Sequence, residues 1–121
     1  MPIRKILIVD DSPTDRQFLL ETLSRHGYQC VCAQNGDEAV VKARSEAPDL
    51  ILMDVVMPGT SGFQATRTIT RDDATRHIPV IMVSSKRQET DRIWGMRQGA
   101  SDYLLKPVNS RELVSKIRSM A

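Results

Sequence analysis

The residues best suited to chemistry each follow an apolar run of the chain. Asp10 and Asp11 follow the first run, Asp54 the second, Ser84 the third and Lys106 the fourth. Carboxylate oxygens bind hard cations such as Mg²⁺, and a carboxylate can also attack phosphorus to form an acyl phosphate. A hydroxyl and an ammonium group can hold the oxygens of a phosphoryl group. The set therefore predicts phosphoryl-transfer chemistry, provided that the fold brings these side chains together.

The three carboxylates need a cation if they converge. Like charges at close range repel, and this repulsion disfavours ionisation of the whole group. Oxygen ligands favour Mg²⁺, Mn²⁺ or Ca²⁺ over zinc, and Mg²⁺ completes its shell with water and phosphate oxygens. We therefore expect a Mg²⁺ site at Asp10, Asp11 and Asp54. Asp54 is the expected nucleophile because it ends the predicted central strand.

The elements that position these residues follow from the apolar pattern. Short apolar runs predict strands buried on both faces, as in a parallel sheet, and they cover residues 6–9, 50–53, 79–83 and 103–105. A more polar segment, 28–33, is typical of an edge strand. Helical segments separate the strands, which indicates an α/β fold. We expect a flavodoxin-like, three-layer, doubly wound parallel sheet of five strands in order 2-1-3-4-5 with five helices. Sites in such sheets form at the carboxyl ends of the strands.

Capping residues and apolar spacing predict the helices. The expected start signals are Ser12 with Pro13, Asn35, Gly62, Gln88 and Asn109, and the expected ends are Gly27, the residues before Pro48, Arg71, Gly99 and the C-terminus. The apolar residues at helical spacing are Phe18, Leu19 and Leu23; Ala39, Val40, Ala43 and Ala47; Phe63 and Ile69; and Leu113, Val114 and Ile117.

Four segments together resemble the receiver domain of bacterial response regulators. They are residues 6–12 (ILIVDDS), 52–59 (LMDVVMPG), 80–84 (VIMVS) and 99–107 (GASDYLLKP). The resemblance runs through nearly the whole chain. It implies one receiver domain over residues 1–121 with no output domain attached.

The resemblance also implies roles for the site residues. Asp54 would be the phosphoacceptor. Asp10 and Asp11 would hold Mg²⁺, and Val56 would lend the metal its backbone carbonyl. Lys106 would pair with a phosphoryl oxygen.

Two residues are implied as the switch. The Ser84 hydroxyl would turn toward the phosphoryl group, and Tyr103 would move between exposed and buried rotamers. The peptide bond between Lys106 and Pro107 is expected to be cis. Val56 and Lys86 occupy positions that control the rate of autodephosphorylation in the family.

Residues 62–67 and 85–100 are similar to the small twitching-motility receivers of type IV pilus chemosensory systems. The distinguishing feature is Trp94-Gly95 inside the fourth predicted helix, where a glycine costs about 1 kcal/mol relative to alanine. Gly95 either permits close packing or a kink, or it adapts the helix for docking. Trp94 is either buried in the core or a partner contact.

Composition bounds the remaining possibilities. A chain of 121 residues with a net charge of +2 is one domain without the basic excess of a nucleic-acid binder. The absence of a long apolar run argues against a membrane segment or signal peptide. Cys30 and Cys32 are expected to be unpaired small hydrophobes in a reducing compartment, the cytoplasm. We expect a monomer.

The combined prediction is a stand-alone response regulator, a signalling protein and not an enzyme in the ordinary sense. A histidine kinase would donate the phosphoryl group, and the fourth helix, fifth strand and fifth helix would bind an output protein. A dehalogenase-type phosphatase would need an acid where Val56 stands, and a dinucleotide site would need glycines after the first strand. The alternatives left open are a phosphorylation-independent interaction module and a phosphate sink.

Overall fold

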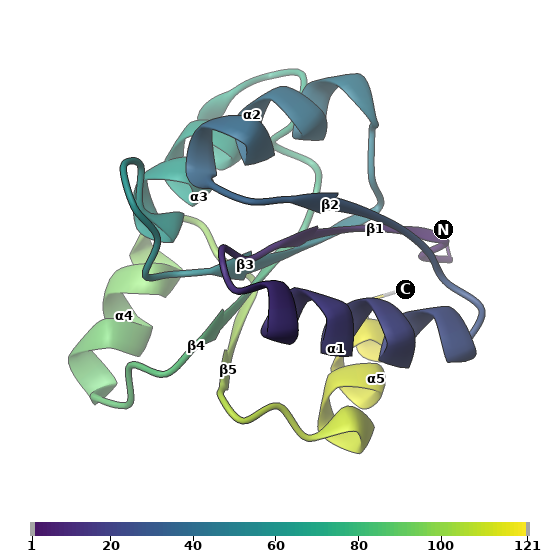
Figure 1. Ribbon diagram of the computed structural model, residues 1–121. Coiled ribbons are helices and arrows are strands. Elements are labelled where there is room, and N and C mark those ends of the chain that lie inside the picture. The colour runs from purple at the N-terminus through teal and green to yellow at the C-terminus, as the bar shows by residue number, and fades with distance from the viewer. Residues whose placement is uncertain (1, 121) are drawn as a thin grey trace.

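The computed structural model describes residues 2–120 and alternates strand and helix (Figure 1). The strands are β1 (Lys5–Val9), β2 (Gln29–Ala33), β3 (Leu50–Asp54), β4 (Val80–Ser84) and β5 (Asp102–Leu105). The helices are α1 (Pro13–Arg25), α2 (Gly36–Ser45), α3 (Gly62–Arg71), α4 (Glu89–Arg97) and α5 (Ser110–Ser119). All strand pairs are parallel and the order is β2-β1-β3-β4-β5, which confirms the predicted doubly wound sheet.

Helices cover both faces of the sheet, so the molecule has three layers. Figure 1 shows α1 and α5 below the sheet and α2 and α3 above it. The core under α1 and α5 is made of large aliphatic side chains: Ile6, Ile8, Leu19, Leu23, Leu50, Leu52, Ile81, Val83, Leu104, Leu113 and Ile117. Because β1, β3 and β4 are buried on both faces, they are apolar along almost their whole length.

Helix α4 packs through its glycine. A Cβ atom on Gly95 would lie 2.6 Å from the Sδ atom of Met82 and within 3.5 Å of the rings of Tyr103 and Phe63. Gly95 thus allows close packing of α4 on the sheet, which was one of the two interpretations of this residue. Trp94 is 48% exposed, so it is not a core residue.

Most predicted caps are confirmed, and two apolar predictions are wrong. Asn35 and Asn109 accept hydrogen bonds from the backbone of α2 and α5, whereas Gly62 is the first residue of α3 and Ser61 is its cap. Phe18 is 44% exposed, because α1 turns Leu19 and Leu23 toward the sheet. Ala47 lies outside α2, since the following proline disfavours a helical conformation there, and its φ is 46°.

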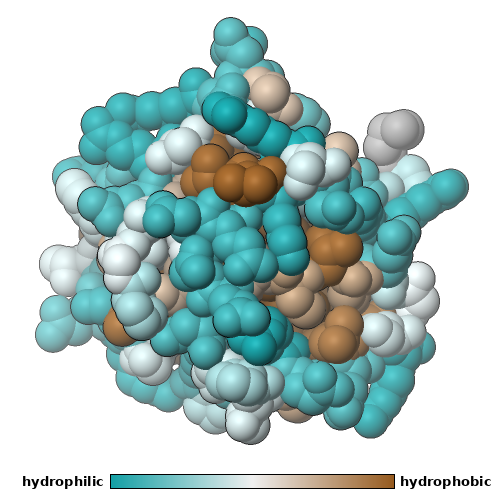
Figure 2. Space-filling model, turned by 45° about the horizontal axis from the view of Figure 1, so that its top comes forward, coloured by the Kyte–Doolittle hydropathy of each residue, from teal (hydrophilic) through white to brown (hydrophobic). Residues whose placement is uncertain are grey.

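The strand register brings the expected site residues to one edge of the sheet. Val9 pairs with Met53, and Asp54 pairs with Val83, so the residues that follow β1, β3 and β4 are neighbours. Figure 2 shows a largely hydrophilic face with small, separated apolar patches. Among residues 2–120, no helix combines the length and the apolarity that crossing a bilayer requires.

Candidate functional site

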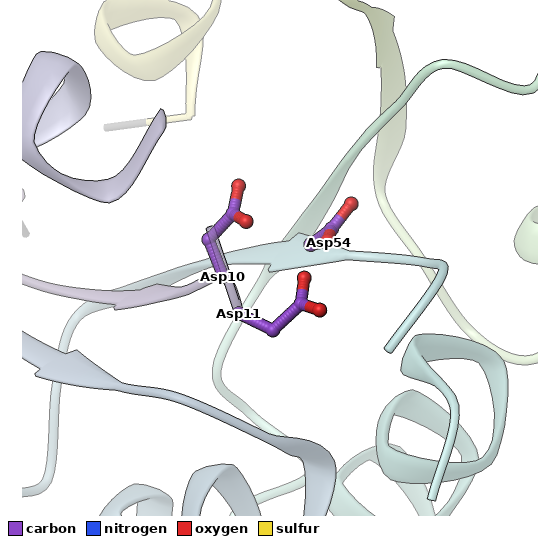
Figure 3. A group of neighbouring side chains, drawn as sticks. All are labelled: Asp10, Asp11 and Asp54. Carbon is purple, nitrogen blue, oxygen red and sulfur yellow. The ribbon is translucent and has the colours of Figure 1, made fainter. Parts of the chain in front are cut away.

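Three carboxylates meet at the carboxyl ends of β1 and β3. Asp10, Asp11 and Asp54 each offer an oxygen, and these oxygens lie within 4.8 Å of one another (Figure 3). Asp10 and Asp54 are buried, whereas Asp11 is exposed to solvent. The predicted convergence of the three acids is therefore confirmed.

Local hydrogen bonds fix the two buried acids. The backbone N–H of Ser12 donates to Oδ1 of Asp10 at 2.9 Å, and Arg16 Nη1 donates to the Asp10 carbonyl at 2.7 Å. The backbone N–H of Val55 donates to Oδ1 of Asp54 at 3.0 Å. The two bonds to Oδ1 orient the carboxylates but leave the group with an excess of negative charge.

The loop after Asp54 folds back closely enough to require a glycine. The N–H of Gly62 donates to the Val55 carbonyl at 2.9 Å. A Cβ atom on Gly62 would lie only 2.0 Å from the Asp54 carbonyl oxygen. A substitution here would push the start of α3 away from the strand end and disturb the backbone of Asp54.

Lys106 is the cation of the site. Its Nζ atom lies 2.9 Å from Oδ2 of Asp15, 3.0 Å from Oδ2 of Asp10 and 3.4 Å from Oδ1 of Asp54. Burial opposes its charge, but the surrounding carboxylates outweigh burial and raise the pKa of Lys106 above its ordinary value. Lys106 therefore stays charged. The Lys106–Pro107 peptide bond is cis, as predicted.

One ammonium does not neutralise the acidic group. Burial, followed by repulsion from Asp10, raises the pKa of Asp54 from 3.8 to about 7, and the attraction of Lys106 only reduces the rise. In the absence of a further cation, Asp54 thus holds its proton well into the neutral range. Strongly perturbed carboxyl groups of this kind are typical of functional sites.

The two predicted switch residues lie beside the site and are linked through one loop. Ser84 is fully buried at the end of β4, and its Oγ atom accepts from the N–H of Lys86 at 3.1 Å. The Tyr103 hydroxyl donates to the carbonyl of Lys86 at 3.0 Å, and the ring is in its buried position. A movement of the Ser84 hydroxyl would therefore break its bond to the backbone of Lys86, the residue whose carbonyl holds Tyr103.

The remaining predicted residues lie at the rim. The side chain of Val56 is exposed. Because it is a hydrocarbon, it offers no polar group that could hold a water molecule. The Lys86 ammonium lies 3.9 Å from Asp91 in a loose, partly exposed ion pair. Two contact residues were missed from the sequence, Asp15 and Arg16, because a first-turn acid and an arginine on α1 carry no signal beyond helix capping and solubility.

The chain matches one protein family over nearly its whole length. Residues 6–118 match the response regulator receiver domain. The protein PilH of Pseudomonas aeruginosa is 54% identical over 116 residues, which cover 96% of each chain.

Solved structures agree with this match. The chemotaxis protein CheY4 of Vibrio cholerae has a TM-score of 0.92 at 30% identity, over 98% of this chain and 99% of that one. The receiver domain of the sensor histidine kinase PA1611 of Pseudomonas aeruginosa, crystallised with magnesium coordinated in its active-site cleft, has a TM-score of 0.90 at 31% identity, covering 97% of this chain and 96% of that one. Fold, site and sequence therefore place this chain in the response regulator receiver family.

Proposed function

We propose that this chain is a response regulator that accepts a phosphoryl group from a histidine kinase on Asp54, with Mg²⁺, and changes its affinity for a protein partner. One observation carries the proposal. Lys106 lies 3.4 Å from Asp54 inside a group of three carboxylates that it fails to neutralise. This arrangement fits a nucleophile that works only when further positive charge is present.

The acidic residues fit Mg²⁺ by their chemistry. The donors are oxygen only and come from two adjacent strand ends, and the pKa of Asp54 is raised by burial and then by repulsion from Asp10. Asp10, Asp11 and Asp54 would hold the ion, with the carbonyl of Val56 as the further protein ligand. When bound, Mg²⁺ would neutralise negative charge on the phosphoryl oxygens.

The chain's own groups account for the transfer step. An oxygen of ionised Asp54 attacks phosphorus, and the O–P bond forms as the P–N bond to the donor histidine breaks. The electron pair remains on the imidazole nitrogen, which then takes a proton. Lys106 pairs with a phosphoryl oxygen and balances the developing charge.

The switch follows from the new charge at Asp54. A phosphoryl group brings a charge of about −2 and strong acceptor oxygens, which attract the Ser84 hydroxyl away from the Lys86 N–H. Because Tyr103 is bonded to the carbonyl of Lys86, its buried position is coupled to that loop. The phosphorylated form thus favours a second arrangement of α4 and β5.

The proposed output surface is the face formed by α4, β5 and α5. Ile93, Trp94 and Met96 of α4 and Leu105 of β5 are partly exposed apolar side chains of these elements, a composition suited to a protein partner. The similarity to PilH along 96% of both chains supports a stand-alone receiver with a role in type IV pilus or twitching signalling. Free thiols at Cys30 and Cys32 suit the expected cytoplasmic location.

Labelling with a small phosphodonor tests the proposal. Wild-type protein with acetyl phosphate and Mg²⁺ should give a phosphorylated band on a phosphate-affinity gel, and the band should be lost with EDTA or in Asp54→Asn. The matched control is Asp73→Asn, which removes a carboxylate that is 93% exposed and outside the site. Equal labelling of Asp54→Asn and wild type would contradict the assignment and favour a phosphorylation-independent module.

A second experiment separates a signal carrier from a phosphate sink. Phosphotransfer from candidate histidine kinases is timed, and binding of partners to the phosphorylated and unphosphorylated forms is compared. A signal carrier should bind a partner with an affinity that depends on phosphorylation and on Trp94. Rapid loss of phosphate without any change in partner binding would favour the sink.

A further inference from the structure

The ammonium group of Lys106 is bound by an acid that stands outside the three-carboxylate group. Asp15 makes the shortest contact at 2.9 Å, compared with 3.0 Å for Asp10 and 3.4 Å for Asp54. Of the three N–H donors of the ammonium group, two donate to Asp15 and Asp10, whereas Asp54 is held only in a longer ion pair. The residue closest to Lys106 is thus neither the nucleophile nor one of the proposed metal ligands.

Asp15 is held in place by a rigid element. It lies in the first turn of α1, where its N–H donates to the Ser12 side chain at 3.3 Å. Leu19 and Leu23 anchor the same helix in the core. The carboxylate is therefore presented to Lys106 from a fixed position, while the lysine extends from the loop after β5.

The Asp15 contact differs from the other two in its solvent exposure. The side chain of Asp15 is 47% exposed, whereas those of Asp54 and Asp10 are 7% and 1% exposed. Asp15 also borders a cavity of about 310 Å³ between α1 and the loop after β5, whose wall includes Lys106, Phe18, Pro107 and Val108. Water and salt therefore reach the Asp15 end of the pair and partly screen it, although the Lys106 side chain is only 20% exposed.

We propose that Asp15 is a positioning residue that binds Lys106 in the unphosphorylated protein and competes with the phosphoryl group for it. The inference rests on the proposed function. During transfer, an Asp54 oxygen bonds to phosphorus as the bond to the leaving group breaks, and the leaving group keeps the electron pair. Lys106 must then turn its donors to a phosphoryl oxygen, and the Asp15 contact has to loosen first. Asp15 therefore slows the reaction.

The test measures initial rates of phosphorylation by acetyl phosphate at low and high salt. Asp15→Asn should react about twofold to fivefold faster than wild type at low salt, which is the range expected for a half-exposed ion pair, and the gain should shrink at high salt. Asp15→Glu keeps the charge and should stay near the wild-type rate. The matched control is Glu21→Gln, an exposed acid of the same helix, which should also stay near that rate.

A second readout follows Lys106 directly, without donor or metal. Hydrogen exchange of its ammonium group is measured by nuclear magnetic resonance, and the signal is identified by its loss in Lys106→Arg. Exchange should be slow in wild type and Asp15→Glu, and at least about twofold faster in Asp15→Asn.

The outcomes separate the two proposals. A faster rate with unchanged ammonium exchange would mean that Asp15 only repels the anionic donor, and it would overturn the positioning role. Equal rates for Asp15→Asn and wild type, or a wild-type lysine that already exchanges fast, would also overturn it. Wild-type protein could fail to accept a phosphoryl group while Asp15→Asn still speeds the exchange of the Lys106 ammonium group. In that case the proposed function is wrong, but the binding of Lys106 by Asp15 is supported.

Discussion

The apolar core under α1 and α5 and the acidic group at the strand ends are built from the same strands, yet they contribute oppositely to stability. The core buries aliphatic side chains completely, Leu113 and Leu23 among them, and burial of this kind drives folding. A few residues further along β3, Asp54 is buried among like charges and its pKa rises to about 7. The fold is therefore stabilised in one region and gives up stability in the other, where a bound cation can supply the missing positive charge.

The largest expected effect is in the core. Leu113→Ala removes a fully buried side chain of α5 and should lower the free energy of unfolding by about 2 to 5 kcal/mol, measured by urea denaturation. Labelling by acetyl phosphate should persist while the protein stays folded, because Leu113 belongs to a core cluster whose buried members include none of the site residues. A loss of less than 1 kcal/mol would contradict the contrast between the two regions.

In the acidic group, a substitution should change the free energy of unfolding in the opposite direction. Asp54→Asn removes a buried carboxylate and should raise the free energy of unfolding at pH 8, without metal, by about 1 to 3 kcal/mol. The variant should be stabilised although it loses its labelling. Destabilisation at pH 8 would show that Asp54 is well compensated by Lys106.

The pH dependence sharpens this contrast. Folded Asp54 has a pKa of about 7, whereas in the unfolded chain it loses its proton near its ordinary pKa of 3.8. Its contribution to stability is thus fully present below about pH 4 and is lost as the pH rises through about 7. In EDTA, the difference in the free energy of unfolding between Asp54→Asn and wild type should grow as the pH rises from about 4 through about 7. A difference that is constant from pH 4 to pH 8 would contradict the raised pKa.

Added cation should relieve the same repulsion. At pH 8, Mg²⁺ at about ten times its dissociation constant should stabilise wild type by about 1.4 kcal/mol, seen as a rise in Tm. Asp11→Asn should need more Mg²⁺ for the same rise, and Asp73→Asn should behave as wild type. An equal response in Asp11→Asn would exclude this carboxylate as a ligand.

The smallest effect is expected on the exposed face of α4. Trp94→Ala removes a half-exposed side chain and should change the free energy of unfolding by no more than about 0.5 kcal/mol, while weakening partner binding. A loss comparable to that of Leu113→Ala would place Trp94 in the core group instead of on the output surface.

The sequence predicted the framework and the convergence of acids because both follow from a simple pattern. Each buried strand is apolar along its length, and a polar residue follows where the sheet ends, so the topology alone brings Asp10 and Asp54 together. Phe18 and Ala47 were not predictable in this way. The inward face of α1 depends on how the helix meets the sheet, and Ala47 depends on its proline neighbour.

The contacts of Lys106 show the limit of prediction at the site. Its side chain was expected to serve a phosphoryl group, and the roles of the site residues remain predictions. The pairing with Asp15 depends on the distance between the start of α1 and the loop after β5, which are 91 residues apart in the chain. No local pattern in the sequence encodes that distance.

The central claim is that Asp54 carries the phosphoryl group. Wild-type protein is phosphorylated with acetyl phosphate and Mg²⁺ and then treated with borohydride, which reduces an aspartyl phosphate to homoserine, and the peptides are analysed by mass spectrometry. The account predicts conversion at Asp54 alone. Conversion at Asp10 or Asp11, or stable phosphate on a hydroxyl such as that of Ser84, would contradict it.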